Sequence, residues 1–336
     1  MHCCFGWFHK LEILKINIVG EIMNIIEKEY KVITTGLKFP EGPIFMNDGS
    51  ILLVEIARGT LSRVSVSGVV NVVAELGGGP NGAAIGPDGS CYICNNGGFE
   101  WEISSDGAGM RPILQANDYS GGSIQKVDLN TGKFITIYTE CNGVSLKGPN
   151  DIVFDKSGNL WFTDLGKVRN RDMDRGAIYW AKPDGSEIKE VIQPFLTPNG
   201  IGLSPDEKTL YVAETEGGKL YSFNIIGDGV VNKLAFPLST NGGMLLNFNG
   251  GVKRFDSLAV ESGGNICVAT LLDGGITIIS PDGGVVEFIK FNDPYITNIC
   301  FGSKDLKKAY ITASYEGLLI EVNWERPGLA LNFLNK

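Results

Sequence analysis

The chain has 336 residues, 43% of them hydrophobic, and a formal net charge of −9. This length and hydrophobic content are enough for a substantial core, so the composition predicts a globular protein. The densest basic stretch, KVRNRDMDR at 167–175, is interleaved with acids and is typical of a loop. Because nucleic acid and anionic membranes are recognised by clustered Lys and Arg, we expect neither as a partner.

The N-terminal stretch MHCCFGWFHKLEILKINIVGEIM lacks the features of a secretory signal or a membrane span. No basic region precedes its aromatic patch, and Lys10, Glu12 and Lys15 interrupt the apolar residues. We therefore expect a cytoplasmic protein. Residues 1–22 are expected to form an appendage, disordered or part-helical, on a single domain at 23–336, with Met23 as an alternative start.

Seven cysteines are an odd number for a disulfide framework, so we expect all of them to be reduced thiols. Cys91 and Cys94 have the CxxC spacing of a zinc or redox site. Their surroundings, SCYICNN, are typical of a strand, in which residues three apart point to opposite faces. We therefore do not expect these two thiols to share a metal.

Taken in chain order, six segments repeat one pattern: a polar residue, a short apolar strand, a turn with Asp, Gly or Lys, and a second strand. The segments are PEGPIFMNDGSILLVE, PNGAAIGPDGSCYICN, PNDIVFDKSGNLWFTD, PNGIGLSPDEKTLYVAE, FDSLAVESGGNICVAT and ITNICFGSKDLKKAYITA. Their polar residues, called the ring residues below, are Glu41, Asn81, Asn150, Asn199, Asp256 and, more weakly, Thr297. In four segments a glycine follows the ring residue by eight positions, which aligns them without gaps: Gly49, Gly89, Gly158 and Gly264.

The ring residues are 40, 69, 49, 57 and 41 residues apart, so a unit of about 40 residues carries insertions, the largest in the second unit. That unit length is typical of a four-stranded propeller blade. The sequence therefore predicts an all-β fold, a six-bladed β-propeller of four-stranded antiparallel blades. The strand YKVITTGL at 30–37 precedes the first unit, and we expect it to complete the last blade and close the ring of blades.

The ring residues are expected to meet at one mouth of the propeller, because the first strands all line the channel in one direction and each ring residue should lie just before its strand. An Asn-Gly pair alone would predict a turn, but Glu41 and Asp256 share the register, and Glu has no preference for positive φ. Carboxylates and amides brought together would repel or stay unpaired without a cation. All donors are oxygens, so we expect one divalent cation, Ca²⁺ first, with Mg²⁺, Mn²⁺, Fe²⁺ or Zn²⁺ as alternatives. The alternative is that the ring residues only cap turns and bond one another across the channel.

The only two histidines, His2 and His9, lie in the predicted appendage. Their position excludes Ser-His-Asp and Cys-His sites, His-ligated zinc and a histidine proton shuttle from the propeller. Any chemistry in the propeller would therefore depend on metal, carboxylate and water.

The motifs FPEGPIF, GPNDIVFD, TPNGIGLSPD and RFDSLAV resemble those of the six-bladed propellers that include gluconolactonase, senescence marker protein and luciferin-regenerating enzyme. The similarity covers about residues 30–324. In that family the acid of the first motif, the Asn of PNG and the Asp of the last motif hold the metal. The resemblance therefore implies Glu41, Asn199 and Asp256 as ligands. Asn150, in the PND motif, corresponds to a further ligand in some members and to a substrate contact in others.

The resemblance implies hydrolysis of a lactone, in particular that of a sugar acid. The metal would polarise the lactone carbonyl and stabilise the oxyanion that forms when water attacks. Asp256 is the expected base for that water, and Asp256 and Glu41 are the expected catalytic residues. A cation would also lower the pKa of Asp256 and limit its basicity, which leaves a metal-bound hydroxide as the competing base.

Substrate hydroxyls need hydrogen-bonding partners around the mouth, and Asn81 and Asn150 are the ring residues best placed to supply them. The insertion at 95–122 follows a second strand, and we expect it to fold over the channel as a lid. Within it, Trp101 is a candidate to stack on a sugar and Arg111 to bind a hydroxyl or carboxylate, although a packed Trp and a solvated Arg are the commoner roles. Three arginines lie in the loop at 169–175, and Arg171 is named from among them as a further candidate for a substrate contact.

Other functions stay open at this point. The same metal would support hydrolysis of another ester or of a phosphotriester. A propeller that binds a ligand without chemistry is the alternative of another class, although the chain lacks the repeated Trp-Asp of scaffold propellers and a scaffold needs no converging carboxylates. A redox propeller with a bound quinone has no positive sign in the sequence. We expect a monomer or a homodimer with a small-molecule substrate.

Overall fold

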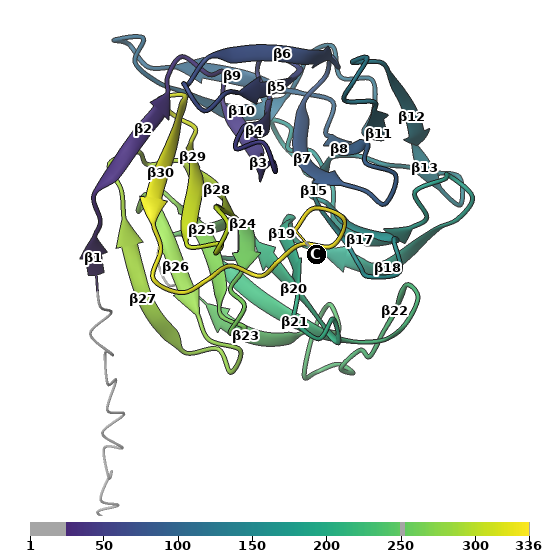
Figure 1. Ribbon diagram of the computed structural model, residues 1–336. Coiled ribbons are helices and arrows are strands. Elements are labelled where there is room, and N and C mark those ends of the chain that lie inside the picture. The colour runs from purple at the N-terminus through teal and green to yellow at the C-terminus, as the bar shows by residue number, and fades with distance from the viewer. Residues whose placement is uncertain (1–24, 249–252, 336) are drawn as a thin grey trace, which may run out of the picture.

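Short apolar strands joined by glycine turns form six sheets around a central channel in the computed structural model, which describes residues 25–248 and 253–335 (Figure 1). The predicted six-bladed β-propeller is confirmed. The predicted appendage at 1–22, with His2 and His9, lies outside the described residues. Within the described part of the chain, no helix is long and apolar enough to cross a membrane.

Blades one to three are antiparallel sheets of four strands whose first strand faces the channel. Blade one has β3 (Pro40–Phe45), β4 (Ile51–Glu55), β5 (Thr60–Val64) and β6 (Val70–Glu75). Blade two has β7 (Pro80–Ile85), β8 (Cys91–Asn95), β11 (Ser123–Val127) and β12 (Phe134–Tyr138). Blade three has β15 (Pro149–Phe154), β16 (Leu160–Asp164), β17 (Gly176–Ala181) and β18 (Ile188–Phe195).

Blades four to six follow the same plan, with additions at their outer edges. Blade four has β19 (Pro198–Leu203), β20 (Thr209–Glu214), β21 (Lys219–Gly227) and β23 (Met244–Phe248), and β22 (Val230–Val231) pairs with the end of β21. Blade five has β24 (Arg254–Val260), β25 (Ile266–Leu271), β26 (Gly275–Ile279) and β27 (Val285–Lys290). Blade six has β28 (Ile296–Gly302), β29 (Lys308–Ala313) and β30 (Leu318–Asn323) from the C-terminal part of the chain.

The N-terminal strands close the ring of blades. β2 (Tyr30–Thr34) pairs antiparallel with β30 as the fourth strand of blade six, which confirms the predicted closure by 30–37. β1 (Ile25–Glu27) pairs parallel with β27 and adds a fifth strand to blade five, which the sequence did not indicate. One N-terminal segment therefore holds two neighbouring blades.

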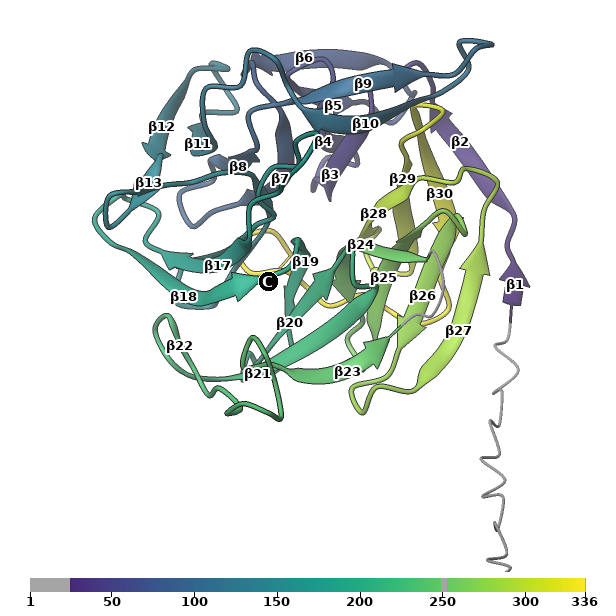
Figure 2. The same ribbon diagram turned by 180° about the vertical axis from the view of Figure 1, so that it is seen from behind.

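Insertions in blade two form two small hairpins, β9 (Phe99–Ile103) with β10 (Met110–Gln115), and β13 (Glu140–Cys141) with β14 (Val144–Ser145). The first hairpin lies along blade one, to one side of the channel (Figure 2). Its Met110 N donates to Tyr315 O on blade six at 3.0 Å. The insertion at 95–122 therefore connects the rims of three blades and is not the lid over the channel that we expected.

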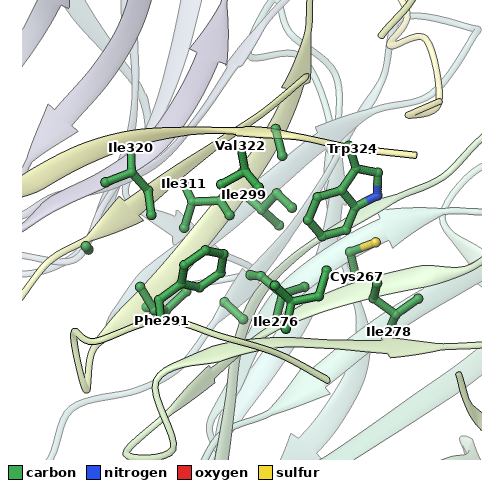
Figure 3. Packing of buried hydrophobic residues seen from close by; sticks show 14 of the residues in the cluster. Cys267, Ile276, Ile278, Phe291, Ile299, Ile311, Ile320, Val322 and Trp324 are labelled. Atoms are coloured by element: carbon green, nitrogen blue, oxygen red, sulfur yellow. The ribbon is translucent and has the colours of Figure 1, made fainter. Parts of the chain in front are cut away.

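The hydrophobic core consists of clusters between neighbouring blades. Figure 3 shows one of them, in which Ile276 and Ile278 of blade five meet Ile311 and Ile320 of blade six. Residues of alternating orientation along one strand enter different clusters, so both faces of each blade are buried. Each blade is thereby fixed by two neighbours.

The cysteine and glycine predictions agree with this packing. Cys91 and Cys94 lie in different clusters on opposite faces of β8, and all five described cysteines are free thiols. The four aligned glycines have φ between 77° and 96°, a left-handed conformation that glycine adopts without a steric cost, in the turn between first and second strands: Gly49, Gly89, Gly158 and Gly264.

The C-terminal segment 325–335 crosses the end of the channel that faces the viewer in Figure 1. Leu329 N donates to Val260 O at 2.8 Å, and Asn332 Nδ2 donates to Phe154 O at 3.2 Å. Both acceptors lie at the ends of first strands, far from the ring residues that begin those strands. The segment therefore closes the far mouth of the channel, a role that the sequence did not indicate.

The Asn-Gly pairs of the repeats lie inside first strands and not in turns. Gly82 and Gly200 have ordinary φ values, but a Cβ on Gly82 would lie 2.4 Å from Asn150 O and one on Gly200 would lie 2.6 Å from Asp256 O. These contacts are with the first strand of the next blade. Glycine is therefore required here by the close approach of neighbouring strands and not by a turn.

We expect Gly200→Ala to lower the free energy of unfolding by about 1–3 kcal/mol, because the new methyl group would push apart the backbones of blades four and five. Chemical denaturation measures this change. Gly263→Ala is the matched control, since a Cβ there meets nothing within 4 Å and φ is not positive. Equal stability of the two variants would contradict the close packing of the first strands.

Candidate active site

The six ring residues lie inside the first strands and not just before them, as we had expected. Each is the second residue of its strand, or the third in β24. At each of them the pairing with the second strand shifts register, for example between Glu41 and Ile44 and between Phe255 and Leu258. A bulge of this kind re-aims side chains. Each first strand therefore begins two or three residues earlier than the sequence indicated, while the convergence of the six strands on the channel is confirmed.

Glu41 is a buried carboxyl group held by blades one and six. Its Oε2 accepts hydrogen bonds from Gly42 N at 2.8 Å and from Asn298 Nδ2 at 2.7 Å. Burial raises the pKa of Glu41 to about 7 even though these bonds favour the charged form. Among the residues that the structure describes, no positive charge therefore compensates for the burial of this carboxylate.

Two further carboxyl groups lie within the electrostatic reach of Glu41. Burial, followed by the charge of Glu41, raises the pKa of Asp256 well above its ordinary value. The same two causes raise the pKa of Asp151 to about 7. Three buried acids, in which the charge of Glu41 raises the pKa of Asp151 and Asp256, favour any cation that can enter between them.

Asp151 and Asn298 are site residues that the sequence analysis missed. Each directly follows a ring residue, in the place that glycine takes in the PNG repeats, and each is buried. Asp151 Oδ1 accepts from Ile152 N at 2.9 Å, and Asn298 donates to Glu41. The sequence did contain a signal for them, because Asp and Asn stand at these two positions where the PNG repeats have Gly.

The amide ring residues differ in how fully they are hydrogen-bonded. Asn199 Nδ2 donates to Thr215 Oγ1 at 3.0 Å, which fixes the orientation of its Oδ1. Asn150 Oδ1 is buried and has no hydrogen-bond partner among the described residues. By contrast, the Thr297 hydroxyl bonds to the Ser314 and Thr312 hydroxyls, so it is satisfied within blade six. Asn150 is therefore the ring residue whose oxygen most clearly lacks a partner.

The residues present fit a hard cation only if amide oxygens take part. In the described ranges 25–248 and 253–335, no group of three or more His, Cys, Asp or Glu side chains is arranged to hold a metal ion. The predicted ligand set has two carboxylates, Glu41 and Asp256, and two amides, Asn150 and Asn199. Its oxygen-only chemistry and the orphaned Asn150 Oδ1 are compatible with Ca²⁺ or a similar ion.

The remaining predicted substrate contacts lie on the rim or have other partners. Trp101 is half-buried and packs on Phe39, with ring centroids 5.1 Å apart. Arg111 donates through Nε to Glu102 at 2.6 Å, and Arg171 is exposed in its loop. Only Asn81 and Asn150, both buried on first strands, belong to the converging set. Trp101 and Arg111 thus have partners within the protein, and their contact with a substrate stays a prediction.

A largely apolar cavity with about 1040 Å³ of empty space, open solvent at its mouth included, occupies the channel beyond the ring residues. Gly42, Asp151 and Asn298 line its end next to the ring residues, and Leu331 and Asn332 of the C-terminal segment line the other end. Its walls are mostly aliphatic residues of the first strands. The chemistry-bearing oxygens therefore lie at one end of the channel, and the cavity lies between them and the C-terminal segment.

Comparison with known proteins gives a family match over most of the chain. The family model described as the SMP-30/Gluconolactonase/LRE-like region matches residues 39–315. A gluconolactonase of Zymomonas mobilis is 26% identical over 316 residues, covering 85% of this chain and 79% of that protein. The lactonase drp35 of Staphylococcus saprophyticus is 28% identical over 249 residues, covering 73% and 68%.

Solved structures share the fold at lower sequence identity. The calcium-binding protein regucalcin of Agrobacterium tumefaciens superposes with a TM-score of 0.71 at 19% identity, covering 93% of this chain and 99% of that chain. A gluconolactonase of Xanthomonas campestris gives a TM-score of 0.69 at 18% identity, covering 89% and 90%. At these identities the likeness is one of fold.

The pKa of Glu41 predicts how the stability of the metal-free protein depends on pH. Its folded pKa of about 7 exceeds the ordinary 4.5, so the stabilising effect of its protonation is complete below about pH 4.5 and is lost as the pH rises through 7. We expect the Tm of chelator-treated protein to fall between about pH 5 and 8. The fall should be shallower in Glu41→Gln, because an amide does not ionise and no longer raises the pKa of its acidic neighbours.

Thermal denaturation across this pH range checks the prediction, with the wild-type protein and the variant measured in the same chelating buffers. Parallel curves for the two proteins would show that Glu41 ionises normally in the fold and would contradict its burial without a counter-charge.

Proposed function

The chain belongs to the SMP-30/gluconolactonase/LRE-like family, and on this basis we propose that it is a metal-dependent hydrolase that opens a lactone, in particular that of a sugar acid. The relatives named gluconolactonase and lactonase support the reaction class. The observation that carries the proposal is the meeting of buried acids and amide oxygens at one mouth of the channel, where burial raises the pKa of Glu41, Asp151 and Asp256 and the charge of Glu41 raises that of the two aspartates further.

A divalent cation is proposed as the cofactor, with Ca²⁺ first. A family-fold neighbour is described as calcium-binding, which favours this choice. Glu41, Asn150, Asn199 and Asp256 would hold the ion through oxygen atoms. When bound, the cation supplies a Lewis acid that polarises the lactone carbonyl and stabilises negative charge on its oxygen.

The residues of the chain would bind the substrate and move the proton. Asp256 is proposed to accept the proton of the attacking water, because it is buried next to the site and no histidine occurs in the described residues. Glu41 is fixed by Gly42 and Asn298, so its role is to keep its carboxylate oriented toward the reacting centre. Burial of these groups also excludes bulk water, which strengthens their interactions with a polar substrate.

Hydrolysis of another ester or a phosphotriester is the second candidate function, because the same oxygen set would serve an attack of water on a phosphoryl group. It is favoured by the same observation, and only the substrate panel distinguishes the two.

The test is hydrolysis of D-glucono-δ-lactone and related sugar lactones by chelator-treated protein, with and without Ca²⁺, Mg²⁺, Mn²⁺, Fe²⁺ or Zn²⁺. We expect turnover only with added metal. Asp256→Asn should lower kcat by roughly 100-fold or more, since general base catalysis contributes about that much. Acid release, corrected for spontaneous opening of the lactone, measures the rate.

Asp282→Asn is the matched control for this substitution, because Asp282 lies in an exposed turn of the same blade. It should retain the wild-type rate. Metal-independent turnover, or full activity of Asp256→Asn, would contradict the proposed mechanism. Hydrolysis of a phosphotriester with no activity on any lactone would replace the proposal by the second candidate.

A further inference from the structure

Blade two contains a buried amide group that the proposed mechanism does not use. Asn96 directly follows β8, is 2% exposed, and its Oδ1 accepts a hydrogen bond from Gly98 N at 2.8 Å. Its Nδ2 is buried and has no partner among the described residues. Exchanging the amide oxygen and nitrogen would leave Gly98 N facing another donor, so the orientation is determined by this bond. An unsatisfied buried donor costs stability and therefore calls for an explanation.

The backbone of Asn96 is fixed on both sides, which restricts the side chain to this place. Asn96 N donates to Gly79 O at 2.8 Å, and Asn96 O accepts from Lys167 Nζ at 3.0 Å. Lys167 is itself buried, donates to Gly98 O at 2.6 Å and lies 4.0 Å from the ring centroid of Phe99. A lysine from blade three therefore holds the segment that carries the unsatisfied amide.

The neighbouring Asn95 shows that unsatisfied amides are not a general feature of this segment. Its Oδ1 accepts from two backbone N–H groups, and its Nδ2 donates to Gly77 O at 2.9 Å and to Gln125 Oε1 at 3.1 Å. Asn95 thus has a complete structural role. The missing partner is specific to Asn96.

The equivalent positions of two other blades show which way Asn96 faces. Asn96 follows the last residue of its second strand, as Thr215 does in blade four and Ser314 does in blade six. Thr215 accepts a hydrogen bond from the ring residue Asn199, and the hydroxyl of Ser314 bonds to the ring residue Thr297 at 2.6 Å. By the same register, Asn96 faces the ring residue of blade two.

Two buried polar groups without partners therefore lie in one sector of the mouth. They are Asn96 Nδ2 and Asn150 Oδ1, and the buried amide of Asn81 is the ring residue of blade two. Blades two and three adjoin here, since a Cβ on Gly82 would touch Asn150 O. An uncharged set of amide donors and acceptors suits a ligand with hydroxyl groups, because each hydroxyl both donates and accepts.

We propose that Asn96 is a specificity-determining residue that donates a hydrogen bond from Nδ2 to a hydroxyl oxygen of a polyhydroxylated substrate. The inference rests on the proposed function in one respect, that the mouth at the ring residues is where the lactone binds. It goes further in naming a residue, Asn96 of blade two, that would select a lactone with ring hydroxyls over an alkyl lactone.

The experiment compares D-glucono-δ-lactone with δ-valerolactone, which has the same six-membered ring without hydroxyls. Asn96→Asp keeps the acceptor for Gly98 N and replaces the unsatisfied donor with a second carboxylate oxygen, which also adds a negative charge that the control variant Asn332→Asp shares. We expect this variant to lower the ratio of kcat/KM for the hydroxylated lactone over δ-valerolactone by roughly three- to tenfold, the effect of one hydrogen bond. Because the readout is a ratio, a general loss of folded enzyme cancels.

Asn332→Asp is the matched control, because it removes a satisfied amide donor at the far end of the channel. It should leave the ratio unchanged even where it lowers Tm. An unchanged ratio in Asn96→Asp would overturn the assignment of Asn96 while leaving lactone hydrolysis intact.

If the wild-type protein opens neither lactone, the proposed function is wrong. The role of Asn96 is then tested separately, by the binding of two ligands that cannot be hydrolysed. Anhydroglucitol has the hydroxylated ring without the lactone carbonyl, and tetrahydropyran has neither. A rise in Tm of the metal-loaded protein with anhydroglucitol alone, lost in Asn96→Asp, would support the polyol site. Equal shifts in the wild-type protein and the variant, or no shift in either, would overturn it.

Discussion

The close packing of six first strands around one channel is the constraint on which the rest of the structure depends. Gly82 and Gly200 lie where a Cβ would collide with the next blade, so the side chains that precede them are confined to buried positions. Burial in turn raises the pKa of Glu41 and Asp256, which places acids where their charge is costly. A cation between them would offset that cost, and this is the physical link from the packing of strands to the proposed chemistry.

The remaining elements hold this arrangement in place. Hydrophobic clusters join each blade to its neighbours, β1 and β2 fasten blades five and six, and the C-terminal segment closes the far mouth. The β9–β10 hairpin reaches from blade two to Tyr315 of blade six, and Lys167 of blade three holds the start of that insertion. The polar mouth therefore lies among elements that are fixed from several blades, as a preorganised site requires.

The sequence was sufficient for features that depend on local chemistry repeated in register. Six ring residues and four glycines in turns led to the blade count, and one early strand led to the closure, because turn glycines and strand alternation leave local signals. Features set by contacts between distant residues were missed or wrong. The bulges at the ring residues, the course of the 95–122 insertion, the packing of Trp101 on Phe39 and the closure by 325–335 all depend on which blade a segment meets. Asp151 lies between these two groups of features. The sequence shows that Asp stands where the PNG repeats have Gly, but it does not show that this carboxyl group is buried near Glu41.

The central claim is that the ring residues of blades one, three, four and five hold one divalent cation, and locating the ion tests it most directly. Crystals grown with Mn²⁺ and measured with anomalous scattering would give the position of every bound ion. The account predicts one dominant peak in contact with oxygen atoms of Glu41 and Asp256 and of at least one of Asn150 and Asn199. No peak at the mouth in metal-loaded crystals, or a dominant peak elsewhere in the channel, would contradict it.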